Sequence, residues 1–340
     1  MNSVPGMSLV EKDLNAFAIE TEFSGVVRVD RPGEEPLTRA FGLAHRGWEI
    51  PNQVDTRFAL ASGSKAMTAL AVVSLIVDGQ LELSTTARSV LGTDLPVIAD
   101  DVTIEHLLAH RSGIGDYLDE STYELSDYVM SVPVQSLVTT EDFVPILDGF
   151  PQRFAPGTRF EYNNGGFVVL ALIAERVSGV PYHDLVRSRV TEPAGMSDTE
   201  FLRSDELPGG VALGYLEVDG VWRTNVFHLP VRGTGDGGIY STAADISLFW
   251  DAFLAGRIVP PEWVNEMVTP RSESTEDERR YGLGLWLHGT SDAVILVGSD
   301  TGVSFWSMRD PISGVGHTTI SNQTSGAWAV SRFLNEQLDF

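Results

Sequence analysis

The sequence of 340 residues contains no cysteine. The protein therefore forms no disulfide, zinc–thiolate site or iron–sulfur cluster, and it uses no thiol nucleophile. Basic residues are also scarce, because 23 Lys and Arg stand against 47 Asp and Glu, which gives a formal charge of −24. Since phosphate groups attract Lys and Arg, this excess of negative charge argues against a nucleic acid or an anionic membrane as partner.

Long hydrophobic runs are missing as well. No uncharged apolar stretch reaches the roughly 18 residues of a membrane span, and Glu11, Lys12 and Asp13 follow a short polar start instead of an apolar leader. We therefore expect a cytoplasmic protein without a secretory signal, unless a leader has been trimmed. Hydrophobic residues make up 43% of the chain, which is enough for a large buried core in one large domain or two interleaved ones.

The spacing of apolar residues predicts helices and strands at both ends of the chain around a mainly helical middle. Helices are expected at residues 9–19, 67–77, 103–109, 141–147, 167–177, 246–254 and 327–338. Strands are expected at residues 23–29, 39–44, 212–218, 221–224, 281–288, 293–298, 304–309 and 316–321. Two acidic stretches, 116–127 and 272–280, are expected to be loops. This order favours a sheet domain with a helical insertion.

The most informative segment leads into the apolar helix at 67–77. Ser62 and Lys65 are three residues apart at a helix start, so their side chains share one face. A serine hydroxyl is a poor nucleophile until a neighbour takes its proton. Lys65 can do so if the apolar helix and the positive helix terminus lower its pKa from about 10.4. The same terminus offers backbone N–H groups, including that of Ser62, to an oxyanion. Taken alone, the pair is also explained by a capped helix start.

A second segment, 156–166, is a turn-rich loop before another apolar helix. Tyr162 can point its hydroxyl into a cleft, where a nearby ammonium favours the phenolate. Asn164 carries both a donor and an acceptor, which can orient Lys65 and a substrate carbonyl or amide. In isolation, a capped turn beside a core aromatic explains this segment equally well.

Together, these segments resemble the serine β-lactamase and penicillin-binding protein superfamily, in its class C, D,D-peptidase and esterase branch. Ser62 with Lys65 matches the first motif, and Tyr162 with Asn164 matches the second. Three further segments match in order and spacing, namely 107–113 (Leu-Leu-x-His-x-Ser-Gly), 237–245 (Gly-Gly-x-x-Ser-Thr-Ala-x-Asp) and 281–286. The resemblance covers nearly the whole chain.

The resemblance implies an α+β fold, in which an antiparallel sheet is flanked by helices on both faces. It also implies one domain over residues 8–338, whose α/β part (8–85 and 235–338) carries a mainly helical insertion (86–234). The implied mechanism needs no cofactor. Ser62 attacks a carbonyl, Lys65 and Tyr162 share the proton transfers, and Asn164 positions the substrate of the acyl-enzyme reaction.

The third family motif is altered. The family places Lys or His, any residue and then Gly on a strand that lines the cleft, and we assign this motif to residues 297–303. Ser299 then replaces the cation and Thr301 replaces the glycine. Ser299 could still donate a hydrogen bond to the substrate, and the N–H of Gly302 could complete the oxyanion hole. Trp306 and Tyr117 are further candidates for substrate contacts.

The missing cation predicts that substrates with an anionic carboxylate are disfavoured, and the acidic loop 116–127 would add repulsion. We expect a small neutral ester or amide as substrate, or one with a free amine. D-amino-acid amidase or D-aminopeptidase activity, β-lactamase or penicillin-binding activity, and a non-catalytic binding role on the same scaffold are the alternatives. The oligomeric state cannot be deduced from the sequence.

Two other motifs point to different chemistry but are incomplete. Asp300 with the following Thr-Gly resembles half of an aspartic protease site, and no second copy occurs in the sequence. His106 and His110 have the spacing of a metalloprotease helix, but Leu107 stands where its catalytic Glu would be. We interpret the histidines as a helix-packing pair, or His110 as a tie for the following loop, and predict no metal.

Overall fold

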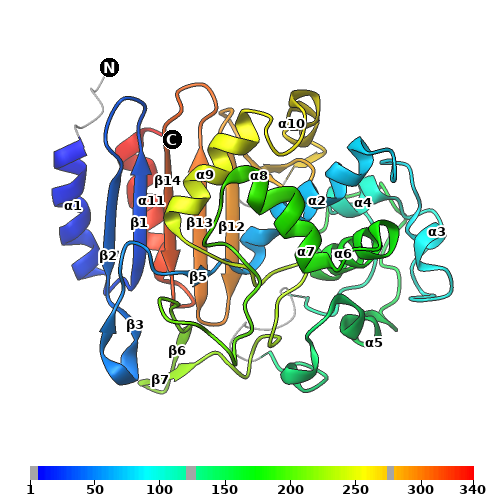
Figure 1. Cartoon of the computed structure of the whole chain (residues 1–340), viewed down its shortest axis with the longest axis horizontal. Helices are drawn as coiled ribbons and strands as arrows, with labels where there is room; N and C mark the ends of the chain where they lie inside the picture. The colour runs from blue at the N-terminus through cyan, green and yellow to red at the C-terminus, as the bar shows by residue number, and fades with distance from the viewer. Residues whose placement is uncertain (1–6, 120–127, 274–278) are drawn as a thin grey trace.

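An eight-stranded antiparallel sheet forms the centre of the molecule (Figure 1). The computed structural model describes residues 7–119, 128–273 and 279–340. In spatial order the strands are β2 (Leu37–Phe41), β1 (Gly25–Asp30), β14 (Gly316–Ser321), β13 (Val303–Arg309), β12 (Val294–Asp300), β11 (Trp286–His288), β10 (Arg279–Tyr281) and β9 (Ser272–Glu273). Both ends of the chain therefore contribute to one sheet, as the strand pattern predicts.

Helices cover both faces of this sheet, which confirms the expected fold class. On one face, α1 (Met7–Glu20) and α11 (Gly326–Leu338) pack on the sheet through an apolar cluster that includes Leu14, Val27 and Leu334. On the other face, α2 (Lys65–Val77) and α9 (Ala243–Leu254) share the main core with inward residues of β1, β12, β13 and β14. The sheet thus lies between two apolar layers.

The helices between residues 87 and 194 lie around α2, from the centre to the right of Figure 1. They are α3 (Ala87–Leu91), α4 (Ile104–Leu108), α5 (Val144–Leu147), α6 (Asn164–Ser178), α7 (Tyr182–Val186) and α8 (Glu192–Ala194). α6 packs against α2, and both are buried along most of their length. This explains why both sequences are apolar on every side.

Short elements complete the described chain. The small strands are β3 (Leu43–His45) with β4 (Ile50–Pro51), β5 (Phe58–Ala59) with β8 (Tyr240–Ser241), and β6 (Tyr215–Val218) with β7 (Val221–Thr224). The remaining helix is α10 (Pro261–Met267), and the single turns are η1 (Arg46–Trp48), η2 (Ala61–Ser64), η4 (Val134–Ser136), η5 (Thr140–Phe143) and η6 (Arg187–Thr191).

Two local predictions were wrong at the sheet edge. The segment 281–288 is not one strand, because a turn at Gly282 and Gly284 separates β10 from β11. Gly284 has φ +79°, and a Cβ there would lie 2.2 Å from the Cβ of Ala69, so a straight strand does not fit against α2. The acidic stretch 272–280 is not only a loop, since its two ends form β9 and part of β10.

In the described residues, no single helix is long and apolar enough to cross a membrane, although α6 together with the segment 182–194, bent by 85°, passes by length and composition.

Candidate active site

Ser62 lies on a tight turn between β5 and α2. Ala61, directly before it, has φ +46°, a conformation that is unusual for a residue with a side chain. Gly298 of β12 approaches this turn so closely that a Cβ there would lie 1.9 Å from the carbonyl oxygen of Leu60. Only glycine fits at this position. The half-buried Ser62 is therefore held between the start of α2 and the end of β12.

Lys65 is 2% exposed and reaches three oxygen atoms. Its Nζ lies 2.8 Å from Ser62 Oγ, 2.8 Å from Asn164 Oδ1 and 2.6 Å from the backbone oxygen of Asp236. The amide of Asn164 is oriented by its own donor, because Nδ2 donates to the Leu118 carbonyl at 2.9 Å.

This arrangement directs Lys65 Nζ toward Ser62. The two carbonyl oxygens, from Asn164 and Asp236, can only accept, so they take two of the amine protons. In the neutral amine the remaining position is a lone pair, and it faces Ser62 Oγ. A neutral Lys65 in this position can accept the serine proton, which is the role that the sequence pattern predicts for it.

Tyr162 lies beside Lys65, its ring centre 5.0 Å from Nζ. Its ring packs between His110, at 4.3 Å between ring centres, and Trp286, at 5.9 Å. Ser62, Lys65 and Tyr162 line one small cavity together with Trp286 and other residues. The structure thus brings the predicted nucleophile and both predicted proton-transfer groups together.

His110 fixes the loop that carries Tyr162. Its backbone oxygen accepts the N–H of Glu161 at 2.9 Å, and its Nδ1 accepts the N–H of Asn163 at 3.1 Å. Because Nδ1 accepts, the ring proton is on Nε2, which donates to the Tyr281 hydroxyl at 3.1 Å. Burial, with a smaller effect of Lys65, lowers the pKa of His110 well below its usual value. His110 is therefore a neutral tie for the loop, one of the two roles we predicted.

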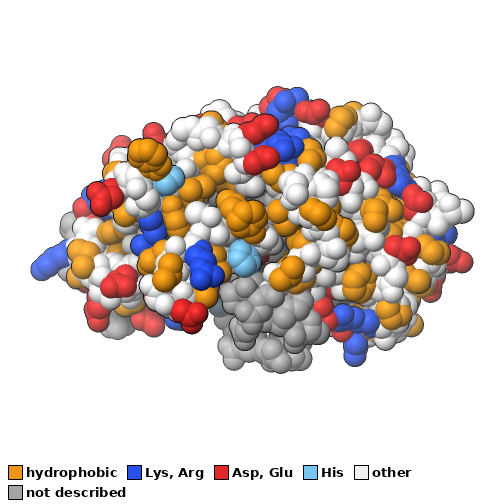
Figure 2. All heavy atoms as spheres, turned by 90° about the horizontal axis from the view of Figure 1, so that it is seen from below, with side chains coloured by type: hydrophobic (Ala, Val, Ile, Leu, Met, Phe, Trp, Pro, Cys, Tyr) orange, Lys and Arg blue, Asp and Glu red, His pale blue; other side chains and the backbone are white. Residues whose placement is uncertain are grey.

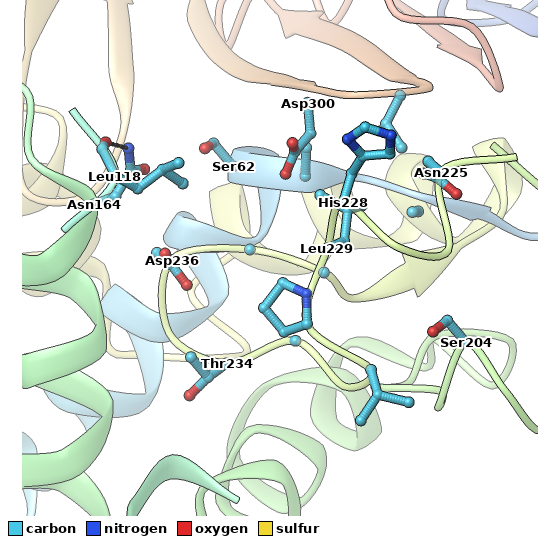
Figure 3. A pocket seen from close by; sticks show the side chains of 18 of the residues that line it. Ser62, Leu118, Asn164, Ser204, Asn225, His228, Leu229, Thr234, Asp236 and Asp300 are labelled. Atoms are coloured by element: carbon cyan, nitrogen blue, oxygen red, sulfur yellow. Dashed lines mark hydrogen bonds between the residues drawn. The ribbon is translucent and has the colours of Figure 1, made fainter. Parts of the chain in front are cut away.

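Ser62 also opens onto a second cavity, in which about 70 Å³ is free and which we call the Ser62 cavity (Figure 3). Its wall includes the predicted residues Asn164, Ser299 and Tyr117. The Tyr117 hydroxyl donates to Asp236 Oδ2 at 2.5 Å, so it holds this carboxylate and only its ring is offered to a ligand. Asp236 is buried, and burial raises its pKa. Sequence reasoning missed Asp236, although it stands directly before the glycine pair of a matched motif.

Asp116 does not repel ligands from an exposed loop. It is buried, and its carboxylate accepts the N–H groups of Asn164 at 2.6 Å and Gly165 at 2.9 Å, at the start of α6. Burial raises its pKa to about 6, against these hydrogen bonds. Residues 120–127 of the acidic stretch lie outside the described residues.

Two predicted contact residues lie elsewhere. The N–H of Gly302 donates to Thr324 Oγ1 at 2.9 Å, in the turn between β12 and β13, so it is not available to an oxyanion. Trp306 lies on the face of the sheet that Ile295 and Val297 share. There it lines another cavity of about 540 Å³ beside α11, whose wall shares Ser299 with the Ser62 cavity. Neither residue lines the cavity described above.

The third motif lies three residues earlier than we predicted. The glycine that contacts the Ser62 turn is Gly298, so the Lys or His position of the family falls on Leu296. Leu296 is 3% exposed and lines the small cavity with Ser62 and Tyr162. A cation is absent from this position, as expected, but the residue in its place is leucine and not Ser299.

This register gives Ser299 a different role. Asp300 and Val303 close a two-residue turn, so they form a hydrogen-bonded pair, and the next pair, Ser299 with Ser304, does not. The N–H of Ser299 therefore points away from β13, toward the edge against which η2 packs. Together with the N–H of Ser62, it is the better candidate for the oxyanion hole.

Comparison with known proteins fits this geometry. A family model described as beta-lactamase matches residues 10–333. The chain belongs to the beta-lactamase family. A penicillin-binding protein from Bacillus halodurans has the same fold, with a TM-score of 0.90, 35% identity, and coverage of 95% of this chain and 99% of that protein.

Curated members of the family have different names. The putative penicillin-binding protein PbpX of Bacillus subtilis is 29% identical over 81% of this chain and 64% of its own length. The esterase EstB of Burkholderia gladioli is 35% identical over 53% of this chain and 47% of its own length. The chain thus spans less than two thirds of the length of these relatives, and their names indicate different activities.

Proposed function

We propose that this member of the beta-lactamase family is a serine hydrolase, which cleaves a small ester or amide through an acyl-enzyme on Ser62. The observation that carries the proposal is the position of Lys65 Nζ, 2.8 Å from Ser62 Oγ, with two of its protons directed to carbonyl oxygens. A binding protein that does not use this serine has no need of a buried lysine aimed at it.

The reaction proceeds by acyl transfer. Lys65 takes the proton of Ser62 as Oγ bonds to the substrate carbonyl carbon, and the N–H groups of Ser62 and Ser299 stabilise the oxyanion. The carbonyl re-forms as the bond to the leaving group breaks, and the proton reaches the leaving oxygen or nitrogen from Lys65 and Tyr162. Water then attacks the acyl-enzyme with the same groups acting in reverse.

The walls of the site support neutral substrates over carboxylates. Leu296 offers no charge where relatives in this branch carry a cation. The described residues that line the Ser62 cavity include no lysine or arginine. A substrate carboxylate would therefore lose water without gaining an ion pair. We infer that penicillin-like substrates react more slowly than short neutral esters.

Covalent labelling tests the proposal. A nitrophenyl alkylphosphonate should add to wild-type protein once, with loss of nitrophenolate, and intact mass of the S62A variant should be unchanged. Hydrolysis of a short nitrophenyl ester should exceed that of a chromogenic cephalosporin. Absence of labelling would favour a non-catalytic binding protein. Faster turnover of the cephalosporin than of the ester would contradict the preference for neutral substrates.

A further inference from the structure

The cavity of about 540 Å³ beside α11 is lined by residues of β12, β13, α11 and the turn after β11, and we call it the α11 cavity. Its volume is in the range of small-molecule sites, about 300–1,000 Å³. Val297 and Trp306 line it, whereas their neighbours Leu296 and Phe305 point to the opposite face and pack in the core with α2. The sheet therefore separates this cavity from the Ser62 side, except at the end of β12, where Ser299 lines both cavities.

A large part of the wall is apolar and aromatic. β12 contributes Ile295 and Val297, β13 contributes Trp306 and Met308, and α11 contributes Trp328. Both indole rings are half-buried, so each presents a surface that a ligand can cover. This wall suits the hydrocarbon or aromatic part of a small molecule.

Two polar atoms of the wall residues are buried without a partner. Trp306 Nε1 and Ser331 Oγ form no hydrogen bond with any described residue, although both residues line the cavity. Buried polar groups nearly always have a hydrogen-bond partner. An indole N–H can only donate and a hydroxyl can donate, so these atoms favour a ligand that brings acceptor oxygens.

Other polar residues of the wall also keep a donor. His288 Nδ1 accepts the N–H of Ser291 at 3.1 Å, so the proton of the neutral ring is on Nε2. Asn335 Oδ1 accepts Nε2–H of His317 at 2.7 Å, which leaves the amide Nδ2 of Asn335 as a donor. The hydrogen-bonding capacity of the wall is therefore mainly that of a donor.

The charge of the wall is positive. Among the described residues that line the cavity, Arg279 and Arg332 are charged, and none is Asp or Glu. Arg279 lies over the ring of Trp286, at 4.5 Å from the ring centre, and belongs to the aromatic part of the wall. Arg332 is exposed on α11, and no acidic side chain in the described part of the chain pairs with it. Arg332 is therefore the cation that we assign to a ligand.

A basic wall is unusual for this protein. The sequence has a formal charge of −24, and Figure 2 shows acidic and basic side chains mixed over the face seen from below. The protein as a whole therefore does not attract an anion, and any preference for one must come from the groups of the cavity.

We propose that the α11 cavity binds a small carboxylate with an aromatic or aliphatic body. The body lies against Trp306 and Trp328, while the carboxylate pairs with Arg332 and accepts hydrogen bonds from the donors of the wall. This site goes beyond the proposed function, because its ligand lies on the other face of the sheet from Ser62 Oγ and is not the substrate.

Calorimetric titration with two matched probes tests the proposal. Phenylbutyrate and phenylbutanol share the same hydrocarbon part, but only the acid is charged at pH 7. The acid should bind wild-type protein about tenfold more tightly than the alcohol. Arg332→Gln should remove this difference, and Arg332→Lys, which keeps the charge, should retain most of it. Arg257→Gln, at an exposed arginine after α9, is the matched control and should bind both probes like wild type.

Protein that has reacted with the phosphonate shows which cavity is occupied. It should bind the acid as tightly as unreacted protein, because the phosphonate on Ser62 fills only the Ser62 cavity. Loss of binding after this reaction would place the acid at Ser62 and overturn the proposal. Equal binding of the two probes, no binding of either, or a preference that survives Arg332→Gln would overturn it as well.

These outcomes are separable from those of the proposed function. A Ser62 that does not react with the phosphonate would contradict the acyl-enzyme alone. The two probes and the Arg332 variants would still decide whether the α11 cavity binds a carboxylate, since this comparison does not use the reactivity of Ser62.

Discussion

The approach of Gly298 to the Ser62 turn can be tested by adding one methyl group. A Cβ at residue 298 would lie 1.9 Å from the Leu60 oxygen and 2.9 Å from the Gly63 nitrogen, and real contacts begin near 3.0 Å. In Gly298→Ala the strand and the turn must therefore separate by about 1 Å. A displacement of this size in a reacting geometry costs about 10²-fold in rate, and the overpacking costs about 1–3 kcal/mol of stability.

Two other glycines provide controls for this substitution. At Gly209 nothing lies within 4 Å of an added Cβ, so Gly209→Ala should match wild type. Gly302 has φ +73° and is close to the backbone of Tyr215, so Gly302→Ala should lose about 1–3 kcal/mol of stability. Because the Gly302 N–H is bound to Thr324, the folded Gly302→Ala protein should keep its activity.

The assay is the rate of phosphonate labelling, corrected for the folded fraction from thermal unfolding of each variant. We expect a loss of about 10²-fold for Gly298→Ala and less than about threefold for the other two. Wild-type labelling by folded Gly298→Ala would refute the argument that this contact aligns Ser62 with Ser299. A large loss in folded Gly302→Ala would favour the original assignment of the third motif.

Three further predictions address the groups around Ser62. His110→Phe should lower the labelling rate about 10–100-fold, because His110 holds Tyr162 in place. In a Tyr162→Phe background the same substitution should lower the rate little further. Additive losses in this double-mutant cycle would contradict the holding role of His110. Because the pKa of Asp116 is raised, the folded state binds more protons than the unfolded state between about pH 4 and 6. Rising pH should therefore lower the free energy of unfolding of the wild-type protein by up to about 3 kcal/mol more than that of Asp116→Asn. Denaturant titrations at several pH values measure this difference. Leu296→Lys should raise the ratio of cephalosporin to nitrophenyl ester hydrolysis about tenfold, because the new ammonium can pair with the substrate carboxylate. Ile312→Lys, which adds the same charge at an exposed residue outside these cavities, should leave the ratio unchanged. Equal ratios in the two variants would show that position 296 does not select against carboxylates.

The convergence of Ser62, Lys65, Tyr162 and Asn164 could be predicted because each stands at the start of a long apolar segment. α2 and α6 are buried on almost every side, so their starts must meet in the interior, and the polar residues there must find each other. The apolar pattern and its spacing carry this information, since a helix that is apolar on all sides must be buried in the core.

The third motif could not be located in the same way. The sequence from Val297 to Val303 holds two glycines, and either can follow a strand. Which of them lies against the Ser62 turn depends on a contact with Leu60, which is more than two hundred residues away in the chain. Placing the motif three residues too late gave Ser299 and Gly302 the wrong roles, and Leu296 was not recognised as a residue of the site.

The charge pattern was misleading for a related reason. Asp116 belongs to an acidic stretch that looks exposed, but the start of α6 supplies N–H groups that satisfy its carboxylate in the interior. Asp300 looked like part of a protease motif, yet in the folded chain it is a wall of the cavity at Ser62. A sequence gives the sign of a charge, whereas its burial and its partners follow from the tertiary structure.

The stiffness of the site follows from the elements that build it. Lys65 belongs to α2, Asn164 to α6 and Gly298 to β12, and these residues are buried in a well-packed interior. Groups that are fixed by the core need little reorganisation when a carbonyl approaches Ser62, which is the condition under which fixed N–H donors stabilise an oxyanion best. By contrast, Asp300 and Ser299 are half-buried at the end of a strand. Selection among substrates can therefore change through these residues while the acyl-transfer groups stay in place.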